Sequence, residues 1–331
     1  MLLRHSSSAE HDTGGHPEGA DRIVALETVL GGRGWLGLEQ MSSPAATDAQ
    51  LERVHSPAHV AAVREFCEGG GGNFDADTIA VPASFGAASH AAGGAVAAVD
   101  AVLAGETNWA FSMHRPPGHH AEAARAMGFC LFNSIAVGAQ HALSEHGLER
   151  VLVIDWDVHH GNGTEEIFGA SDQVLFASIH QSPLYPGTGP ASYIGDGPGE
   201  GYTVNMPVAP GAGDPEFLAL LQHVVDPLAR AFEPELLMLS AGFDAHADDP
   251  LANCEVTSAG FGRMAVVLRE LAIDLGLPLV ACLEGGYDLR ALVTSTAAMI
   301  EGFEAGGVAG ESDPGLAGVH RRRVAERWRI G

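Results

Sequence analysis

The residues best suited to chemistry follow a short apolar run at 151–154. Asp155, Asp157 and His159 alternate directly after this run, whose β-branched residues predict a strand that is buried on both faces. Side chains two residues apart on extended backbone point the same way, so Asp157 and His159 can bind one metal ion. A third ligand must then come from elsewhere in the chain. The alternative is a strand end that carries ordinary solvated polar residues.

A pair of histidines occupies a second polar segment, 115–122, with the sequence RPPGHHAE. Its two prolines restrict the backbone just before His119 and His120. Imidazole titrates near neutral pH, so paired histidines on a restricted backbone suit proton transfer. The alternative interpretation is two surface histidines without a catalytic role.

Two more polar segments complete the set of candidate residues. In 240–250, SAGFDAHADDP, Asp244 is the natural third ligand, and an Asp–His–Asp set with an open position is typical of catalytic zinc. In 283–288, LEGGYD, two glycines give Tyr287 conformational freedom, and its hydroxyl could stabilise an oxyanion. A turn carboxylate and a core tyrosine are the alternatives.

Other residues in these segments are expected to be structural. Gly161 and Gly163 suit a tight turn at the end of the strand. Asp248 and Asp249 are expected to be solvated turn residues.

Composition limits the classes of protein to consider. The chain has 331 residues, 46% of them hydrophobic, and a formal net charge of −25, which argues against a nucleic-acid-binding surface. Four cysteines form no C-x-x-C pair, which favours a reduced, cytoplasmic setting. We find no signal segment and no run that approaches 18 apolar residues, so we expect neither secretion nor a membrane span. Every basic side chain other than histidine is arginine, which has no functional explanation.

Strands alternate with helices along the chain. Apolar runs predict strands at 109–114, 151–154, 174–179, 235–240 and 278–283. Helices are expected near 20–30, 56–67, 84–104, 214–231, 257–275 and 289–304. This alternation predicts one α/β domain over residues 1–331 with a mainly parallel sheet, whose ligands bind where strands end. The basic tail from His320 is expected to be a helix on the acidic body, a subunit contact or a solvated end.

Seven segments together closely resemble the histone deacetylase family. They are RPPGHHAE, GFCLFNS (128–134), IDWDVHHGNGT (154–164), SIHQ (178–181), YPGTG (185–189), SAGFDAH (240–246) and LEGGYD. The resemblance is greatest to class II members, the bacterial histone deacetylase-like amidohydrolases and the acetylpolyamine amidohydrolases. It covers a core of about residues 16–304 and leaves 305–331 as a C-terminal tail. It implies a three-layer α/β/α arginase–deacetylase fold around an eight-stranded, mainly parallel sheet, and zinc-dependent hydrolysis of acetylated amines.

The resemblance also implies metal sites. One zinc ion is expected on Asp157, His159 and Asp244. A potassium ion is expected nearby, at a site that includes Asp155 and Ser178 and is formed partly by backbone oxygens.

The same resemblance implies catalytic roles. His120 corresponds to the general base, and Asn162 is its neutral partner, as in class II members. His119 corresponds to the electrostatic partner that helps the leaving amine to acquire a proton, and Asp155 orients it. Tyr287 corresponds to the tyrosine that stabilises the transition state.

A substrate channel is implied as well. Its expected residues are Gly128, Phe129, Tyr185, Leu251, Asp77 and Gly285. Tyr185 stands where many members have phenylalanine, and Asp77 corresponds to a rim aspartate that binds substrate backbone. Leu251 stands where polyamine-specific members can carry an acidic residue, which argues modestly against a dedicated polyamine enzyme.

Several alternatives stay open at this stage. The substrate could be an acetyl-lysine peptide, an acetylpolyamine or a small acyl amide. A binuclear manganese hydrolase of the arginase type shares the fold, and a non-catalytic binder of acylated ligands is a further alternative. The sequence fixes neither the acyl-chain preference nor the oligomeric state, and a homo-oligomer stays open. No nucleic-acid or membrane partner is expected.

Overall fold

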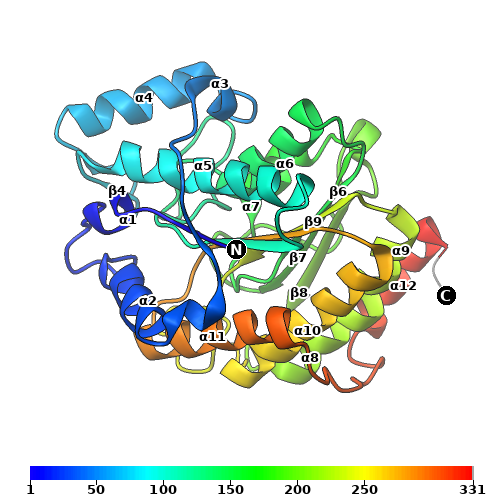
Figure 1. Ribbon diagram of the computed structural model, residues 1–331. Coiled ribbons are helices and arrows are strands. Elements are labelled where there is room, and N and C mark those ends of the chain that lie inside the picture. The colour runs from blue at the N-terminus through cyan, green and yellow to red at the C-terminus, as the bar shows by residue number, and fades with distance from the viewer. Residues whose placement is uncertain (330–331) are drawn as a thin grey trace.

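A parallel β-sheet forms the centre of the protein in the computed structural model, which describes residues 1–329 (Figure 1). Its strand order is β2-β1-β5-β10-β9-β6-β7-β8, and each neighbouring pair is parallel. The strands are β1 (Leu2–Arg4), β2 (Gln40–Ser42), β5 (Trp109–Ser112), β6 (Val151–Asp155), β7 (Val174–Gln181), β8 (Thr203–Val208), β9 (Leu236–Ala241) and β10 (Leu279–Leu283). A separate antiparallel pair joins β3 (Gly72–Asn73) to β4 (Ile79–Ala80).

Helices connect the strands and cover the sheet. They are α1 (Ser7–Glu10), α2 (Asp21–Gly32), α3 (Asp48–Leu51), α4 (Pro57–Glu68), α5 (Ser84–Leu103), α6 (Ser134–Glu145), α7 (Asn162–Phe168), α8 (Asp214–Leu220), α9 (Asp226–Phe232), α10 (Ser258–Leu275), α11 (Leu289–Ala305) and α12 (Gly318–Trp328). Short 3₁₀ helices lie at η1 (Gly34–Gly37) and η2 (Gly197–Gly199), and a π-helical segment, η3 (Leu221–Val225), joins α8 to α9.

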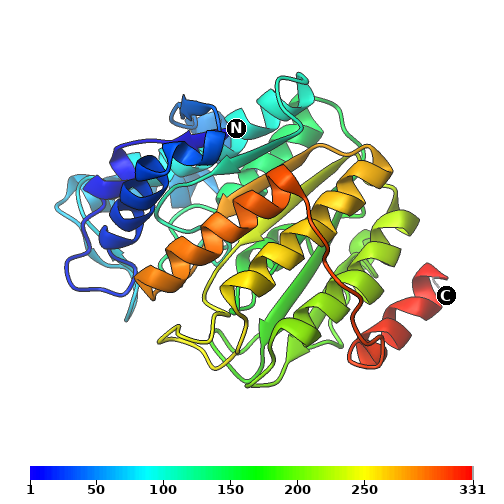
Figure 2. The same cartoon turned by 60° about the horizontal axis from the view of Figure 1, so that its bottom comes forward.

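Two hydrophobic cores lie on opposite faces of the sheet. Alternate residues of β6 divide between them: Leu152 and Ile154 belong to one core, Val151 and Val153 to the other. Helices α4, α5 and α6 cover one face, and α2, α8, α10 and α11 cover the other (Figures 1 and 2). This is the three-layer α/β/α arrangement that the sequence predicts, and the eight-stranded sheet is confirmed.

The five strands and six helices expected from the sequence are present with small differences at their ends, except that the helix expected at 214–231 divides into α8, the π-helical η3 and α9. The sequence analysis missed β1 and β2, which have three residues each, and β8, whose TVNMPV includes Asn205 and Pro207. These three strands lie at the outer positions of the sheet. Short edge strands need no continuous apolar run, so periodicity does not reveal them.

Helix α5 packs tightly against the sheet because its residues are small. A Cβ atom on Gly94 would lie 2.6 Å from Ser112 Oγ of β5, so only glycine fits there. By length and composition alone α5 could cross a membrane, and it is the one such helix among residues 1–329. In the structure 78% of that window is buried inside the protein.

The C-terminal tail forms a helix that packs on the body. The Trp328 ring contacts Tyr202 and Phe232 edge-on, and its indole N–H donates to the Gly201 carbonyl at 3.1 Å. The first of the three expectations for the tail is therefore confirmed through Trp328, while Ile330 lies outside the described residues.

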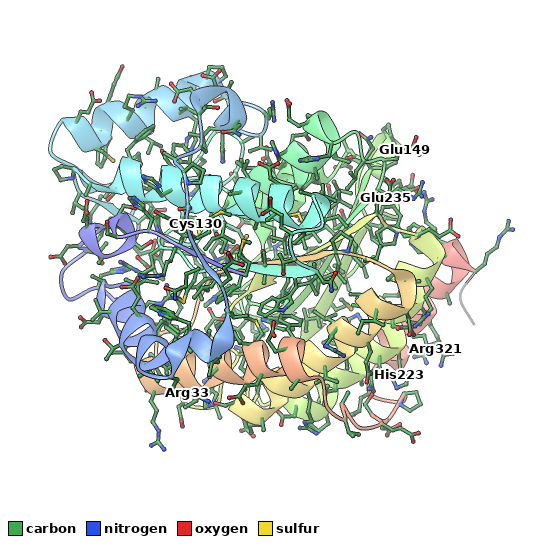
Figure 3. All side chains as sticks on the ribbon, viewed as in Figure 1. Arg33, Cys130, Glu149, His223, Glu235 and Arg321 are labelled. Atoms are coloured by element: carbon green, nitrogen blue, oxygen red, sulfur yellow. The ribbon has the colours of Figure 1, made fainter. Side chains whose placement is uncertain are left out.

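All four cysteines are free, buried thiols. Cys130 lies well inside the molecule, where burial raises its thiol pKa well above the usual value (Figure 3). Charged residues such as Glu149 and Glu235 lie at the periphery in the same view. The cysteines therefore behave as core residues.

A group of histidines lies beyond the ends of β1 and β5. The ring of buried His114 contacts Ser112 Oγ at 2.9 Å and Ser43 Oγ at 2.8 Å. Burial, followed by the charges of His90 and His5, lowers the pKa of His114 to about 3. His114 is therefore neutral in the folded protein at neutral pH.

This pKa predicts a loss of stability in acid. The folded-state pKa lies below the unfolded value of about 6.5, so the stabilising contribution is complete above pH 6.5 and is lost as the pH falls towards 3. Urea unfolding at about pH 7.5 and about pH 5.5 measures this loss. His114→Gln should reduce the difference between the two pH values by about 1 kcal/mol. An unchanged difference would contradict a neutral His114.

Candidate active site

The polar segments meet at the carboxyl ends of neighbouring strands. In the sheet, β10 lies beside β9 and β9 lies beside β6, although these strands are far apart in the sequence. Asp155 ends β6, Asp244 follows β9, and Tyr287 follows β10. This edge is where ligands bind in open parallel sheets.

Asp157, His159 and Asp244 form a compact, buried group. Their ligand atoms lie within 4.8 Å of one another, and His159 Nδ1 is 3.2 Å from Asp157 Oδ1 and 3.1 Å from Asp244 Oδ2. Burial, together with the charge of Asp157, raises the pKa of Asp244 to about 7. Two buried carboxylates that face one imidazole need a cation to be stable together, and this donor set matches a three-residue zinc site with an open position.

Glycines allow these carboxylates to approach one another. A Cβ on Gly285 would lie 2.0 Å from Asp244 Oδ2, and one on Gly242 would lie 2.1 Å from Asp157 Oδ2. The Gly285 N–H also donates to Asp157 Oδ2 at 2.8 Å. Gly285 therefore makes room for the acidic residues, which the sequence analysis did not foresee.

Gly161 shows the same close approach. A Cβ there would lie 2.2 Å from Asp155 Oδ2, whereas its φ of −74° is accessible to any residue. Gly161 lies at the centre of a tight turn, as expected, since the Asn162 N–H donates to the His160 carbonyl at 2.8 Å. The space beside Asp155 is a second constraint on this residue, which the sequence did not show.

The two histidines differ in their partners. His119 Nδ1–H donates to Asp155 Oδ2 at 2.9 Å, and His120 Nδ1–H donates to Asn162 Oδ1 at 2.7 Å. Burial opposes the charged form of both rings. The charges of Asp155 and Asp157 nevertheless raise the pKa of His119 well above its usual value. The pKa of His120 falls well below its usual value because of burial and the neighbouring histidines.

The buried Glu284 side chain holds the backbone of the segment that carries His119 and His120. Its Oε2 accepts the Gly118 N–H at 2.6 Å and the His119 N–H at 3.1 Å, and its Oε1 accepts Ser240 Oγ–H at 3.1 Å. Burial raises its pKa to about 7. This carboxylate fixes the backbone of His119 relative to β9 and β10.

A cavity of about 190 Å³ leads to this group. Its lining residues are Asp77, His120, Gly128, Phe129, His159, Leu184, Tyr185, Leu251 and Tyr287. The structure thus brings together five of the six residues expected in the channel, and it adds Leu184. Gly285, the sixth, does not line the cavity and lies behind the acidic residues instead.

The wall of the cavity depends on Gly128. Its φ is +57°, and a Cβ there would lie 2.4 Å from Cδ2 of His120. Phe129 also has a positive φ, of +69°, and its ring contacts Tyr287 edge-on at 5.7 Å between centroids. The glycine therefore leaves space for the His120 ring beside the cavity.

Arg22 is a residue at this site that the sequence analysis missed. Its guanidinium donates to the carbonyls of Glu284 at 2.5 Å and Gly286 at 2.7 Å, and it lies over the Tyr287 ring at 5.0 Å. It is 1% exposed and pairs with buried Glu18 at 3.0 Å. A signal existed, because Arg22 precedes Leu26 by one turn on the buried face of a predicted helix.

Asp249 corrects another expectation. It is 7% exposed, and its carboxylate accepts the backbone N–H of Tyr287 at 2.7 Å and of Leu251 at 2.9 Å. Burial raises its pKa to about 6. Asp249 is therefore not a solvated turn residue, since it links the cavity mouth to the segment that carries Tyr287.

Ser178 lies directly beside Asp155, because the two residues pair in the register of β6 and β7. The Ser178 hydroxyl is hydrogen-bonded to His180 Nδ1 at 2.9 Å. This hydrogen bond does not use all the lone pairs of the hydroxyl oxygen, and potassium at Asp155 and Ser178 stays a prediction.

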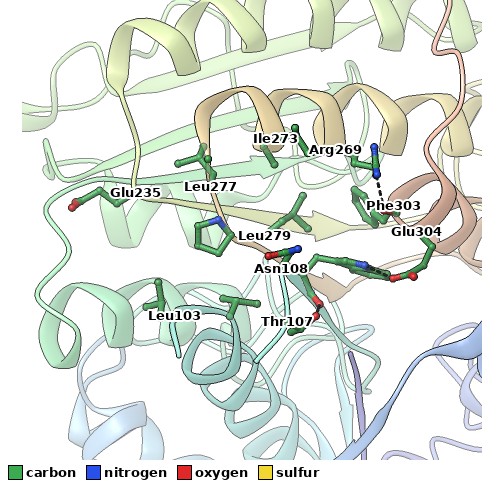
Figure 4. A pocket seen from close by; sticks show the side chains of 15 residues that line it. Leu103, Thr107, Asn108, Glu235, Arg269, Ile273, Leu277, Leu279, Phe303 and Glu304 are labelled. Carbon is green, nitrogen blue, oxygen red and sulfur yellow. Dashed lines mark hydrogen bonds between the residues drawn. The ribbon is translucent and has the colours of Figure 1, made fainter. Parts of the chain in front are cut away.

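A larger cavity of about 660 Å³ lies at the opposite edge of the sheet (Figure 4). It includes the first residues of β5 and β10, Trp109 and Leu279. Its charged side chains have partners of their own: Glu304 accepts the Trp109 indole N–H at 2.6 Å, and Arg269 donates to the Phe303 carbonyl at 3.0 Å. Size alone therefore does not identify the active site here.

Comparisons with known proteins agree with this geometry. Residues 16–303 match the family model described as the histone deacetylase domain. The chain is 41% identical over 276 residues to the histone deacetylase-like amidohydrolase of Pseudomonas aeruginosa, covering 82% of this chain and 73% of that protein. It is 39% identical over 300 residues to a probable deacetylase of Archaeoglobus fulgidus, covering 89% and 81%.

The fold agrees as well. The crystal structure of the HDA15 HD domain superposes with a TM-score of 0.90 at 37% identity, covering 99% of this chain and 93% of that one. The architecture is that of the arginase–deacetylase class. Within it, this chain belongs to the histone deacetylase family.

The contacts of Gly285 predict that Gly285→Ala disrupts the Asp157–His159–Asp244 group. The new methyl group would overlap Asp244 Oδ2 and push the carboxylates apart. We expect the variant to lose zinc binding at this group, measured as bound zinc per chain after equilibrium dialysis. Gly86→Ala is the matched control, because a Cβ at Gly86 of α5 meets nothing within 4 Å. Equal zinc binding at this group in both variants would show that the close approach does not matter.

Proposed function

We propose that this chain is a zinc-dependent deacetylase that hydrolyses the acetyl amide of acetyl-lysine or a related acylated amine. The observation that carries the proposal is the cavity lined by His120, His159 and Tyr287, which includes a member of the Asp157–His159–Asp244 group. A narrow cavity that brings one amide to a metal site and a proton-transfer pair fits amide hydrolysis.

Asp157, His159 and Asp244 are the residues that would hold zinc. When bound, zinc polarises a carbonyl group and lowers the pKa of water to about 7. Hydrogen bonds already fix the ligands, since Asp157 accepts from Gly285 N–H and Asp244 accepts from Val158 N–H at 2.8 Å. Such outer contacts orient metal ligands and maintain their charge.

His120 and His119 divide the proton transfers. A neutral ring can accept a proton from the attacking water, and burial favours the neutral form of His120. Asp155 favours the charged form of His119, which can supply a proton to the leaving amine. Asn162 orients the His120 ring without adding a negative charge.

Tyr287 supplies the hydrogen bond that stabilises the reacting oxygen. Its ring lines the cavity, and burial raises the pKa of its hydroxyl well above the usual value, so the hydroxyl keeps its proton. A donor fixed in this position before reaction stabilises negative charge that develops on the substrate oxygen.

The cavity favours acetyl-lysine over acetylpolyamine. Leu251 in the cavity wall offers no charge to the second amine of a polyamine, and Asp77 in the same wall offers a carboxylate to substrate backbone N–H groups. A binuclear manganese centre is less well supported, because the Asp157–His159–Asp244 group would hold one ion, and the other candidate metal group in residues 1–329 lies away from it, on α5, on α6 and directly after α6. A non-catalytic binder would not require the proton-transfer residues His119 and His120, which are both present beside the cavity.

An assay on two substrates tests this function. Metal-free protein should be inactive, and added zinc should restore hydrolysis of both an acetyl-lysine peptide and an acetylated polyamine. The kcat/KM should be higher for the peptide. Higher kcat/KM for the polyamine would overturn the substrate assignment, and equal activity with and without metal would overturn the zinc chemistry.

The contact between Asp249 and Tyr287 predicts coupled losses of activity. Tyr287→Phe should lower kcat by about 10²-fold or more, as loss of an oxyanion donor does. Asp249→Ala should lower kcat by about 10-fold to 100-fold, because it frees the Tyr287 backbone. In the Tyr287→Phe background, Asp249→Ala should then cost little more. Independent, additive losses would show that Asp249 does not act through Tyr287.

A further inference from the structure

A second group of metal-binding side chains lies on the helices of one face. Asp100 belongs to α5, His141 belongs to α6, and His146 directly follows α6. Asp100 Oδ1 is 2.7 Å from His141 Nε2 and also 2.7 Å from His146 Nε2. The three ligand atoms lie within 4.8 Å of one another, and no other such group occurs in residues 1–329 apart from the active-site group.

The chemistry of this group matches that of the active-site group. Both combine imidazole nitrogens with carboxylate oxygens, which are ligands that zinc binds in tetrahedral sites. His141 is largely buried, whereas the side chains of His146 and Asp100 are 30% and 52% exposed. The group therefore offers three ligands from a fixed scaffold and leaves its outer side open to water as a fourth ligand.

The other ring nitrogen of His141, Nδ1, faces Arg53. A metal on Nε2 places the ring hydrogen on Nδ1, where Arg53 Nη1 now lies 3.3 Å away. Arg53 is held by Glu145, which is one helical turn after His141. Since a guanidinium only donates hydrogen bonds, metal binding at Nε2 requires Arg53 to move away from Nδ1.

We propose that Asp100, His141 and His146 form a second binding site for a divalent transition-metal ion, with zinc as the best match. The site is separate from the catalytic edge. Helix α5 leads into the start of β5, and α6 leads into the start of β6, so both helices end at the opposite edge of the sheet. An ion there connects the end of α5 to the end of α6, and its role is to stabilise this face.

Zinc counting tests the proposal. Metal-free protein is equilibrated with zinc, unbound metal is removed, and the zinc bound per chain is measured. Wild type should bind two ions and His146→Ala one, with a smaller rise of Tm on adding zinc. His223→Ala, on η3 away from both groups, is the matched control and should bind two.

Asp244→Ala separates this site from the catalytic one. It should bind one zinc, and combining it with His146→Ala should abolish binding. Equal stoichiometry in wild type and His146→Ala would overturn the second site and leave the proposed function intact. If Asp244→Ala binds as much zinc as wild type while His146→Ala binds one fewer, the second site stands and the catalytic zinc fails. Circular dichroism of each variant confirms the fold.

Discussion

The repulsion between two carboxylates that have lost their water is the constraint around which this protein is built. Asp157 and Asp244 are fully buried at the ends of adjacent loops, and only one imidazole lies between them. Glycines at 242 and 285 give the oxygens room, and backbone N–H groups face the oxygens that do not point at the metal position. Without a cation, burying these two carboxylates together raises the free energy of the folded state. Binding of a cation would relieve this destabilisation.

Around this centre, a second layer of buried charges fixes the loops. Glu18 binds Arg115 with both carboxylate oxygens, at 2.5 Å and 2.7 Å, and also binds Arg22. Arg22 in turn binds the carbonyls of the segment before Tyr287. Glu18 and Arg22, near the N-terminus, therefore help to fix the position of Tyr287. A buried network of this kind is rigid because each member satisfies the others.

The sequence predicted most of the residues at the candidate active site, but few of the buried residues that hold them in position. Continuous apolar runs revealed β5, β6, β7, β9 and β10, and the polar residues after them were therefore placed at one edge. Strands β1 and β2, with three residues each, were too short to show a pattern. Asp249 was assigned to a solvated turn and Arg22 was missed, because local sequence does not show which distant backbone groups these side chains will contact. The sequence showed the turn at Gly161 but not its close approach to Asp155, because that approach exists only in three dimensions.

The strand order has a consequence for when the two proposed metal sites form during folding. The catalytic ligands stand together only after β6 has paired with β9, whose pairing closes a long loop of chain. Asp100 and His141 are nearer in sequence, and they meet as soon as α5 packs on α6. Contacts between distant segments form late in folding, so a nascent chain would present the helical site to metal before the catalytic one exists. Which of the two proposed sites binds metal first would then depend on the order in which they form, as well as on their affinities for the metal.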